Sequence, residues 1–383
     1  MSFRRGPLSV GERVQLTDRR GRKLTVMLEP GGLTQTDHGL LPHEAMIGLP
    51  EGSVVVTISA DKWRQIRHKQ DADTDTEAPD RAKPWKSSRG IGGWTFTVMR
   101  PRLEDYILSM PRGAQIMYPK DVARVILLGD IRPGMKVLES GAGSGAMSLG
   151  LLDAIGTEGK LTSIERRKEF ARIAMGNATV FFGQLPAQWD LRTGDFDTVV
   201  AGLPEDGFDR IVLDMLDPWN RLEQAFRVMA PGGVLTAYVT TTTQLSRLAE
   251  ALRADGRWTE PEIMESLERS WKADGLAVRP EHEMIGHTGF LITSRAMASG
   301  QQALRKHIRA TKDYQTDVDQ GRGPAKNSGF GQEPEMNDPE DLEDLEDLED
   351  LELRRVSDRK LRKVLRDLDH QVRTLEGGKG QES

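Results

Sequence analysis

Alternating apolar and polar residues predict strands in the first part of the chain. Residues 9–18 (SVGERVQLTD) alternate, the stretch KLTVMLEP does so after the turn-like RRGR, and LPEGSVVVTIS continues the pattern. Residues 62–90 are rich in Pro, Ser, Lys and Asp and predict a flexible insertion. Residues 94–99 (WTFTVM) then resume the strand pattern. We therefore expect residues 1–100 to form a small N-terminal β-domain.

Strand and helix patterns alternate between residues 101 and 298. The strand-like runs are VLES, KLTSIE, WDLRTGDF, FDRIVLDM and GGVLTAYVT, and a helical pattern follows all of them except the third. Closing strands are expected between residues 262 and 296. Repeated strand–helix units predict an α/β domain with a doubly wound, mostly parallel sheet.

The last part of the chain, residues 299–383, is polar and then acidic. Residues 333–352 contain twelve acidic residues and no basic one, with Leu at every third position, a spacing that drifts around a helix instead of forming a stripe. A short amphipathic helix near residues 354–376 is predicted by spacings of four and three between Leu361, Leu365, Leu368, Val372 and Leu375. We expect the tail to be disordered apart from this helix, and the whole of it to lie outside the packed core.

Composition narrows the function classes. A chain of 383 residues can hold two domains plus tails. Of the net charge of −6, residues 333–352 carry −12 and residues 353–383 carry +4, which leaves +2 for residues 1–332. The nearly neutral body gives weak support for a nucleic-acid partner. The absence of cysteine excludes disulfides and thiolate zinc sites. With neither a membrane-length apolar run nor an apolar start, a cytoplasmic protein without membrane contact is expected.

A glycine-rich loop carries the first chemical signal. Glu139 ends a predicted strand, and Gly141, Gly143 and Gly145 precede a predicted helix. Glycines let the chain turn sharply there and let a cofactor approach the backbone. Because Ala146 completes a dinucleotide-type pattern with the first two glycines, the loop alone leaves NAD and S-adenosylmethionine open.

Two acidic residues at later strand ends fit a nucleoside cofactor. Glu165 ends the second strand and is placed to accept hydrogen bonds from ribose hydroxyls. Asp195 ends the third strand and could accept from an adenine amino group, but a helix N-cap is an equally good interpretation.

The segment VLDMLDPW suggests recognition of a flat base. Asp214 lies at the carboxyl end of the fourth strand, the edge where such sheets bind ligands. Its carboxylate could accept from an exocyclic amine, and Trp219 could stack on the base, although core packing explains that tryptophan equally well. His282 and His287 lack a metal-type spacing, so we interpret both as structural or RNA-facing and expect no metal.

At several separated places the sequence resembles the bacterial tRNA (adenine-58-N1)-methyltransferases of the TrmI family, of the actinobacterial type. The resemblance covers residues 6–60 and 94–298, and its matching stretches include DYILSMPRGAQIMYPKD, VLESGAGSGAMS, DRIVLDMLDPW and GLAVRPEHEMIGHTGFL. It implies a class I methyltransferase fold, assembly as a homotetramer, and S-adenosylmethionine as methyl donor to N1 of a flipped-out tRNA adenine. The insertion at residues 62–90 and the acidic tail are departures from the family.

The resemblance also implies roles for individual residues. Cofactor contacts are expected at Ser144, Gly145, Ala146, Met147, Glu165, Phe170, Asp195 and Asp214. Asp214 is the position that touches both cofactor and target base, and Tyr118 and Tyr238 match positions lining the pocket. The alternatives are an NAD(P)-dependent oxidoreductase, for which a Tyr-x-x-x-Lys pair is missing after residue 200, and a non-catalytic RNA-binding protein.

Overall fold

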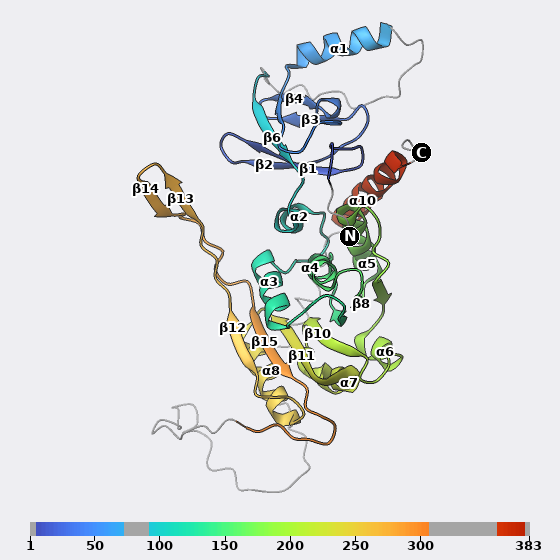
Figure 1. The fold of residues 1–383 in the computed structure, drawn as a ribbon, viewed down its shortest axis with the longest axis vertical. Coiled ribbons are helices and arrows are strands. Elements are labelled where there is room, and N and C mark those ends of the chain that lie inside the picture. Colours follow the sequence, from blue (N-terminus) through green and yellow to red (C-terminus); the bar gives the residue numbers. More distant parts are fainter. Residues whose placement is uncertain (1–4, 73–91, 306–357, 380–383) are drawn as a thin grey trace.

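The computed structural model describes residues 5–72, 92–305 and 358–379. Within these ranges the chain forms a β-domain at its N-terminal end and a larger α/β domain, with helix α2 (Leu103–Ser109) at their junction (Figure 1). Two side chains of the β-domain reach this helix: Arg13 donates to the carbonyl of Ser109 at 2.5 Å, and Lys23 pairs with Asp105 at 2.6 Å.

The N-terminal domain is built around a four-stranded antiparallel sheet. Its strands, in spatial order, are β2 (Lys23–Met27), β1 (Arg13–Asp18), β6 (Thr95–Met99) and β5 (Val54–Val56). A separate hairpin pairs β3 (Leu33–Thr36) with β4 (Gly39–Pro42), followed by η1 (His43–Ala45). Val14, Leu16 and Val98 of the main sheet are fully buried. The alternation in the sequence thus marks the strands of the sheet, whereas the β3–β4 hairpin was not anticipated.

The expected flexible insertion begins with a helix. Helix α1 (Ala60–Ala72) occupies the first part of residues 62–90. The hydroxyl of Ser59 accepts from the backbone N–H of Lys62 at 3.2 Å, which satisfies one of the free donors of the first turn. This hydrogen bond stabilises the start of a helix in a stretch that is otherwise polar. Residues 73–91 lie outside the described residues.

A seven-stranded sheet forms the centre of the second domain. Its spatial order is β12 (Glu262–Glu265), β15 (Phe290–Arg295), β11 (Met229–Val239), β10 (Phe208–Asp214), β7 (Lys136–Ser140), β8 (Lys160–Glu165) and β9 (Trp189–Thr193). The five strands from β11 to β9 pair in parallel, and β15 pairs antiparallel with both β11 and β12. The order jumps from β10 to β7, the kind of switch point beside which such sheets bind ligands.

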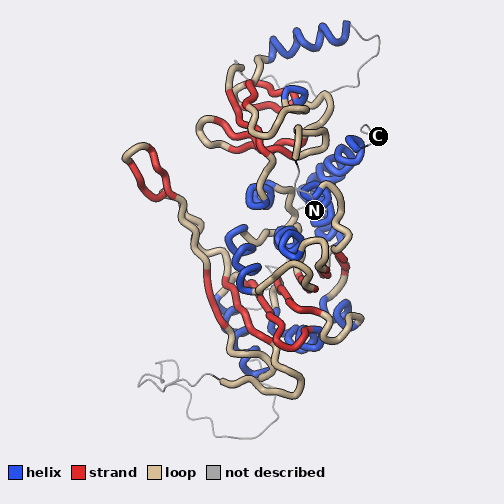
Figure 2. The backbone as a smooth tube through the Cα atoms, viewed as in Figure 1, coloured by secondary structure: helices blue, strands red, loops and turns tan. Residues whose placement is uncertain are grey.

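Helices cover both faces of this sheet (Figure 2). One core cluster contains Val212 and residues of α3 (Pro119–Leu128), α4 (Ala146–Ile155) and α5 (Lys168–Phe182). The other contains Ile211, Leu213 and residues of α6 (Phe196–Ala201), α7 (Leu222–Val228) and α8 (Thr242–Asp255). Neighbouring residues of β10 thus point to opposite faces, as strand geometry requires. The prediction of a mostly parallel α/β sheet is confirmed.

Two peripheral elements complete the described structure. Strands β13 (Trp271–Asp274) and β14 (Ala277–Pro280) form a hairpin that projects from the domain (Figure 1). Helix α10 (Asp358–Lys379) packs on α5, and its Leu368 is only 3% exposed. The expectation that the tail stays outside the packed core therefore does not hold for this helix, because its apolar stripe finds an apolar surface on α5. The acidic run at residues 333–352 lies outside the described residues, and no helix within them is long and apolar enough to cross a membrane.

Candidate functional site

Four side chains from adjacent parallel strands gather at one edge of the sheet. Glu139 of β7, Glu165 of β8, Asp214 of β10 and Tyr238 of β11 all lie at or near the carboxyl ends of their strands. Side chains two or four residues apart on a strand point to the same face of the sheet. The four residues are related in this way to Val137, Leu161 and Val212 of the first core cluster, or belong to that cluster, so all four point to the face that Val212 covers. The sequence predicted each of them separately, and the fold brings them together.

The glycine loop has the geometry for which its glycines are required. Gly141, Gly143 and Gly145 have φ angles of 91°, 53° and 90°, in the left-handed region that disfavours side chains. A β-carbon at Gly141 would overlap the backbone carbonyl of Asp214. Gly145 is the N-cap of α4. The positive φ angles and the contact with Asp214 therefore account for glycine in this loop, which is held against the main chain of Asp214.

Glu165 is tied to the glycine loop. Its carboxylate accepts from the backbone N–H of Gly143 at 2.8 Å and from that of Arg167 at 3.0 Å. The side chain is only 4% exposed. These two bonds fix the carboxylate at the carboxyl end of β8, in the place where the sequence predicted a ribose acceptor.

Glu139 is fully buried beneath the loop. One carboxylate oxygen accepts from the hydroxyls of Ser148 at 2.7 Å and Ser163 at 2.5 Å, and Ser163 in turn accepts from the indole of Trp189 at 2.8 Å. The other oxygen has no hydrogen-bond partner in the described part of the chain. Burial raises the pKa of Glu139 to about 7. Ser163 and Trp189 were missed by sequence reasoning, although Ser163 shares the strand face of Glu165.

Asp214 is the least satisfied carboxylate of the group. No hydrogen-bond donor reaches its side chain from the residues that the structure describes, and the side chain keeps part of its surface open. Most of the volume around the carboxylate is nevertheless protein. The resulting desolvation, together with the charges of Glu139 and Glu165, raises the pKa of Asp214 to about 7. A group of three carboxylates, in which Asp214 receives no donor from the described residues, favours a ligand that carries positive charge and N–H groups.

Of the two predicted pocket tyrosines, Tyr238 lies beside Asp214, and Tyr118 lies near Tyr238. Tyr238 is paired with Asp214 in the β10–β11 register and donates its phenol proton to the carbonyl of Thr288 at 2.5 Å. Burial raises its pKa, and the nearby charges of Asp121 and Asp214 raise it further. Tyr118 is close enough to act in the same direction, and it is the N-cap residue of α3.

The remaining predicted cofactor residues mostly hold the site together. The Ser144 hydroxyl accepts from the backbone of Gly113 at 3.1 Å and of Ala114 at 3.3 Å. Ala146 and Met147 are buried in the core at the start of α4. Asn177 was missed by the sequence, although its amide donates to the Ser144 carbonyl at 2.9 Å and to the Pro111 carbonyl at 2.8 Å.

Three further candidates surround the site. Phe170 packs with Ile173 and Leu368, and the Arg167 guanidinium lies 3.8 Å from its ring centre. Asp195 caps α6 by accepting from the Asp197 N–H at 3.0 Å. Trp219 packs partly against the second core cluster.

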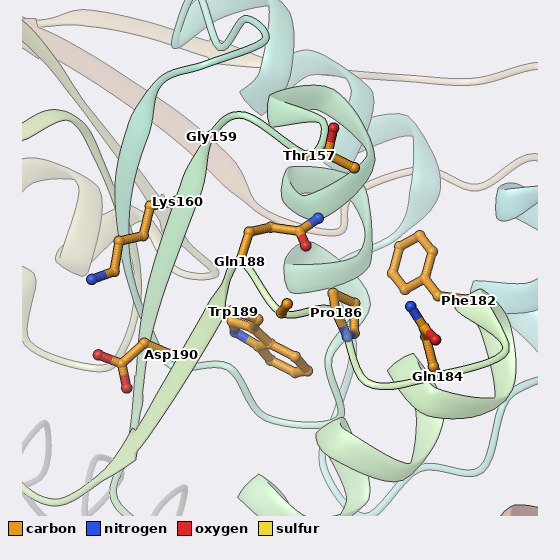
Figure 3. Close-up of a pocket in the computed structure, with 10 residues that line it drawn as sticks. Thr157, Gly159, Lys160, Phe182, Gln184, Pro186, Gln188, Trp189 and Asp190 are labelled. Carbon is orange, nitrogen blue, oxygen red and sulfur yellow. The ribbon is translucent and has the colours of Figure 1, made fainter. Parts of the chain in front are cut away.

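Neither a groove at the far edge nor a metal cluster adds to the site. An open groove of about 730 Å³ lies between β8 and β9 at their amino ends, where Lys160, Trp189, Gln184 and Gln188 line it (Figure 3). It is at the opposite end of these strands from Glu165. In the described ranges no group of three or more Asp, Glu or His side chains is placed to hold a metal ion.

Sequence comparison with known proteins matches both domains. The family profile described as TrmI-like N-terminal matches residues 6–55, and that of the tRNA methyltransferase complex GCD14 subunit matches residues 93–276. The chain is 31% identical over 280 residues to the tRNA (adenine(58)-N(1))-methyltransferase TrmI of Thermus thermophilus, covering 73% of this chain and 95% of that protein. It is 31% identical over 224 residues to the adenine-57/adenine-58 enzyme of Methanocaldococcus jannaschii, covering 53% and 79%.

Solved structures agree on the fold. A tRNA (m1A58) methyltransferase TrmI from Aquifex aeolicus superposes with a TM-score of 0.61 at 25% identity, over 77% of this chain and all of that one. A SAM-dependent O-methyltransferase from Thermotoga maritima gives a TM-score of 0.64 at 25% identity, over 77% and 97%. These two proteins are named for different acceptors, so the fold does not determine the acceptor, whereas the sequence match over both domains identifies the family. The chain belongs to the TrmI family of tRNA (adenine(58)-N(1))-methyltransferases.

Proposed function

We propose that this protein transfers a methyl group from S-adenosylmethionine to N1 of adenine 58 in the T-loop of tRNA. The observation that carries the proposal is the Asp214 carboxylate, which lacks a donor from the described residues, while the backbone carbonyl of the same residue lies against Gly141 of the glycine loop. At Asp214, the amino group of a target base could meet the bound cofactor. Family membership supplies the acceptor, because the relatives of known activity methylate this adenine.

The residues present fit the cofactor. Glu165 is placed for the ribose hydroxyls at the end of β8, and Asp195 keeps one carboxylate oxygen beyond its capping bond. The partnerless buried oxygen of Glu139 and the raised pKa of Asp214 favour a positively charged ligand. S-adenosylmethionine supplies such a charge and an electrophilic methyl group on its sulfonium. Glu139, Gly141, Gly143, Ser144, Gly145, Ala146, Met147, Glu165, Phe170, Asp195 and Asp214 would surround it.

Asp214 would orient the target base. Adenine N1 has an in-plane lone pair, so direct displacement needs alignment and exclusion of water but no covalent enzyme intermediate. The carboxylate would accept from the adenine amino group and offset the positive charge that develops on the ring. A base inside a folded T-loop must first be extruded, and Tyr118, Tyr238 and Trp219 are the aromatic groups available to receive it.

Two measurements test the proposal. S-adenosylmethionine and its demethylated product should raise the melting temperature, whereas NAD should not. At a ligand concentration 100 times the dissociation constant, the free energy of unfolding should increase by about 2.7 kcal/mol. Mass mapping of nucleosides after incubation with unmodified tRNA should then find 1-methyladenosine at position 58. Stabilisation by NAD alone would support the oxidoreductase alternative. Stabilisation by S-adenosylmethionine without modified tRNA would point to another acceptor.

We further propose that the protein is a cytoplasmic homotetramer that meets its tRNA there. Support for self-association comes from the projecting hairpin, where Trp271, Leu276 and Val278 expose 63%, 105% and 62% of their surface. Light scattering on the full chain should give four times the 42.7 kDa monomer mass. A monomer over the whole concentration range would contradict this assembly.

A further inference from the structure

A buried ion pair between Lys120 and Asp121 contacts the base of a projecting segment. We call residues 266–288 the arm: it leaves β12, carries the β13–β14 hairpin and returns to β15. Glu268 and Ile285 form an isolated bridge between its two sides. Lys120 and Asp121, in the first turn of α3, lie where both sides meet the domain, with side chains only 7% and 1% exposed.

The pair contacts both sides of the arm at once. The Lys120 ammonium donates to the Ser266 carbonyl on the outgoing side at 2.8 Å and to the Thr288 hydroxyl on the returning side at 2.5 Å. It also pairs with Asp121 at 2.8 Å. The Thr288 hydroxyl donates to the other Asp121 oxygen at 2.7 Å. The three side chains thus form a closed, charge-assisted network.

The same threonine holds Tyr238 through its backbone. The phenol of Tyr238 donates to the Thr288 carbonyl at 2.5 Å. The next residue, Gly289, lies so close to the tyrosine that a β-carbon there would overlap the ring. The position of the Thr288–Gly289 backbone therefore sets the height and tilt of Tyr238 beside Asp214.

A contribution to folding stability does not by itself explain why a buried ion pair lies here. Removing two charges from water costs energy, and well-packed apolar residues often serve a buried position as well or better. The strands around it are already held by the β12–β15 and β11–β15 ladders. What a charged network adds is one defined geometry at the point where the arm meets the pocket.

A second contact holds the arm from the side of β11. The His287 ring contacts the carboxylate of Glu265 at 2.7 Å and the backbone carbonyl of Thr240 at 2.8 Å. This carbonyl lies just beyond the end of the strand that carries Tyr238. Two successive residues on the returning side of the arm are thus held: His287 by Thr240, and Thr288 by the Lys120–Asp121 pair.

We propose that Lys120, Asp121 and Thr288 are positioning residues that fix Tyr238 in the pocket for the target base. This inference rests on the proposed methyl transfer, since the pocket is defined by that reaction. It assigns no chemical step to the three residues. Their effect passes through the Tyr238 phenol.

The experiment compares Lys120→Met, Asp121→Asn and Thr288→Val in the full-length protein, with Thr288→Ser as the conservative variant. Lys136→Met is the matched control, because Lys136 is exposed at the opposite end of β7. Single-turnover methyl transfer should slow by up to about 100-fold in the first three, the size expected for a misplaced pocket group. Affinity for S-adenosylmethionine should stay within about threefold, and Thr288→Ser should recover most of the rate.

A double-mutant comparison separates positioning from general damage. In a Tyr238→Phe background the further effect of Thr288→Val should disappear, because the phenol that it positions is gone. An undiminished effect in that background would overturn the proposal. So would a loss of cofactor affinity equal to the loss of rate.

A readout independent of methyl transfer keeps the test valid if the proposed function is wrong. The chain has four tyrosines, so fluorine-labelled tyrosine should give few resonances, and Tyr238→Phe identifies one of them. Lys120→Met and Thr288→Val should shift the Tyr238 resonance and leave that of Tyr106 in place. An unmoved Tyr238 resonance would overturn the positioning role, whereas a missing methylated product in the wild type would count only against the proposed function.

Discussion

The backbone carbonyl of Asp214 lies directly against the α-carbon of Gly141, and a β-carbon at residue 141 would overlap it. Asp214 is the last residue of β10, and Gly141 directly follows the adjacent parallel strand β7. This contact joins the loop that would carry the cofactor to the carboxylate that would meet the base. The distance between the two ligands is thereby set by main-chain atoms, which have little freedom to adjust.

Gly141→Ala should therefore damage the site more than an ordinary glycine substitution. The φ of 91° adds strain of about 1–3 kcal/mol, and the overlap with Asp214 must push the two strand ends apart. We expect cofactor affinity to fall by more than tenfold, measured by calorimetry. Gly134→Ala is the matched control, because Gly134 has a φ of +86° but no atom within 4 Å of the added carbon. Equal effects of the two variants on binding would refute the importance of the contact.

Asp214→Asn should slow methyl transfer while leaving tRNA affinity nearly unchanged. The substitution keeps the shape but removes the charge, and loss of one preorganised electrostatic contact costs roughly 100- to 1,000-fold in turnover. Phosphate contacts spread over a large surface dominate the affinity for tRNA. Single-turnover kinetics at saturating ligands, with separate binding titrations, measure the two effects. Asp153→Asn, at an exposed position of α4, is the control. A near wild-type rate for Asp214→Asn would move base recognition elsewhere.

Cofactor binding should tighten as the pH rises from 6 to 8 and should release protons. The pKa values of Glu139 and Asp214 are both raised to about 7, so near pH 6 the folded protein holds protons on these groups. A cationic ligand favours the charged carboxylates, and the protons leave when it binds. Calorimetry in buffers of different ionisation enthalpy counts the released protons. Proton uptake, or affinity independent of pH, would contradict this electrostatic account.

The same two groups should make the ligand-free protein less stable as the pH rises. A carboxyl group with a raised pKa binds its proton more tightly in the folded state than in the unfolded one. Its effect is therefore absent below the ordinary pKa of about 4 and becomes unfavourable as the pH increases to about 7. Glu139→Gln should flatten this part of the stability curve in chemical denaturation at several pH values. An unchanged curve would show that Glu139 is not a source of the dependence.

Truncation before residue 300 should lower stability but spare methyl transfer. Helix α10 covers Phe170 and Ile173 with Leu368, and removal of this helix exposes that apolar surface. Leu368→Ala alone should cost about 2 kcal/mol or more. Arg366→Ala is its control, since 77% of the Arg366 side chain is exposed. Thermal unfolding and single-turnover assays at saturating cofactor measure the two outcomes. Loss of most activity on truncation would show that α10 is needed for the site itself.

Local sequence was sufficient for much of the fold and for the core of the site. Periodicity predicted the parallel strands and their helices, because period two and period 3.6 are properties of short segments. The glycines at 141, 143 and 145 and the acidic residues at strand ends could be recognised for the same reason: the backbone conformations and strand ends that they mark are local. Glu139, Glu165 and Asp214 were each recognised in this way, whereas Tyr238 was expected only from the family resemblance.

Only the tertiary structure decided how those residues are supported. Ser163 holds Glu139, which is 24 residues away, and Lys120 holds Thr288, which is 168 residues away. No local pattern predicts such pairs, since they depend on which elements become neighbours when the core packs. The docking of α10 is of the same kind: its stripe of leucines was visible in the sequence, but its partner surface on α5 exists only after folding. Local sequence therefore determined which residues could perform the chemistry, and long-range packing determined which groups hold them in place.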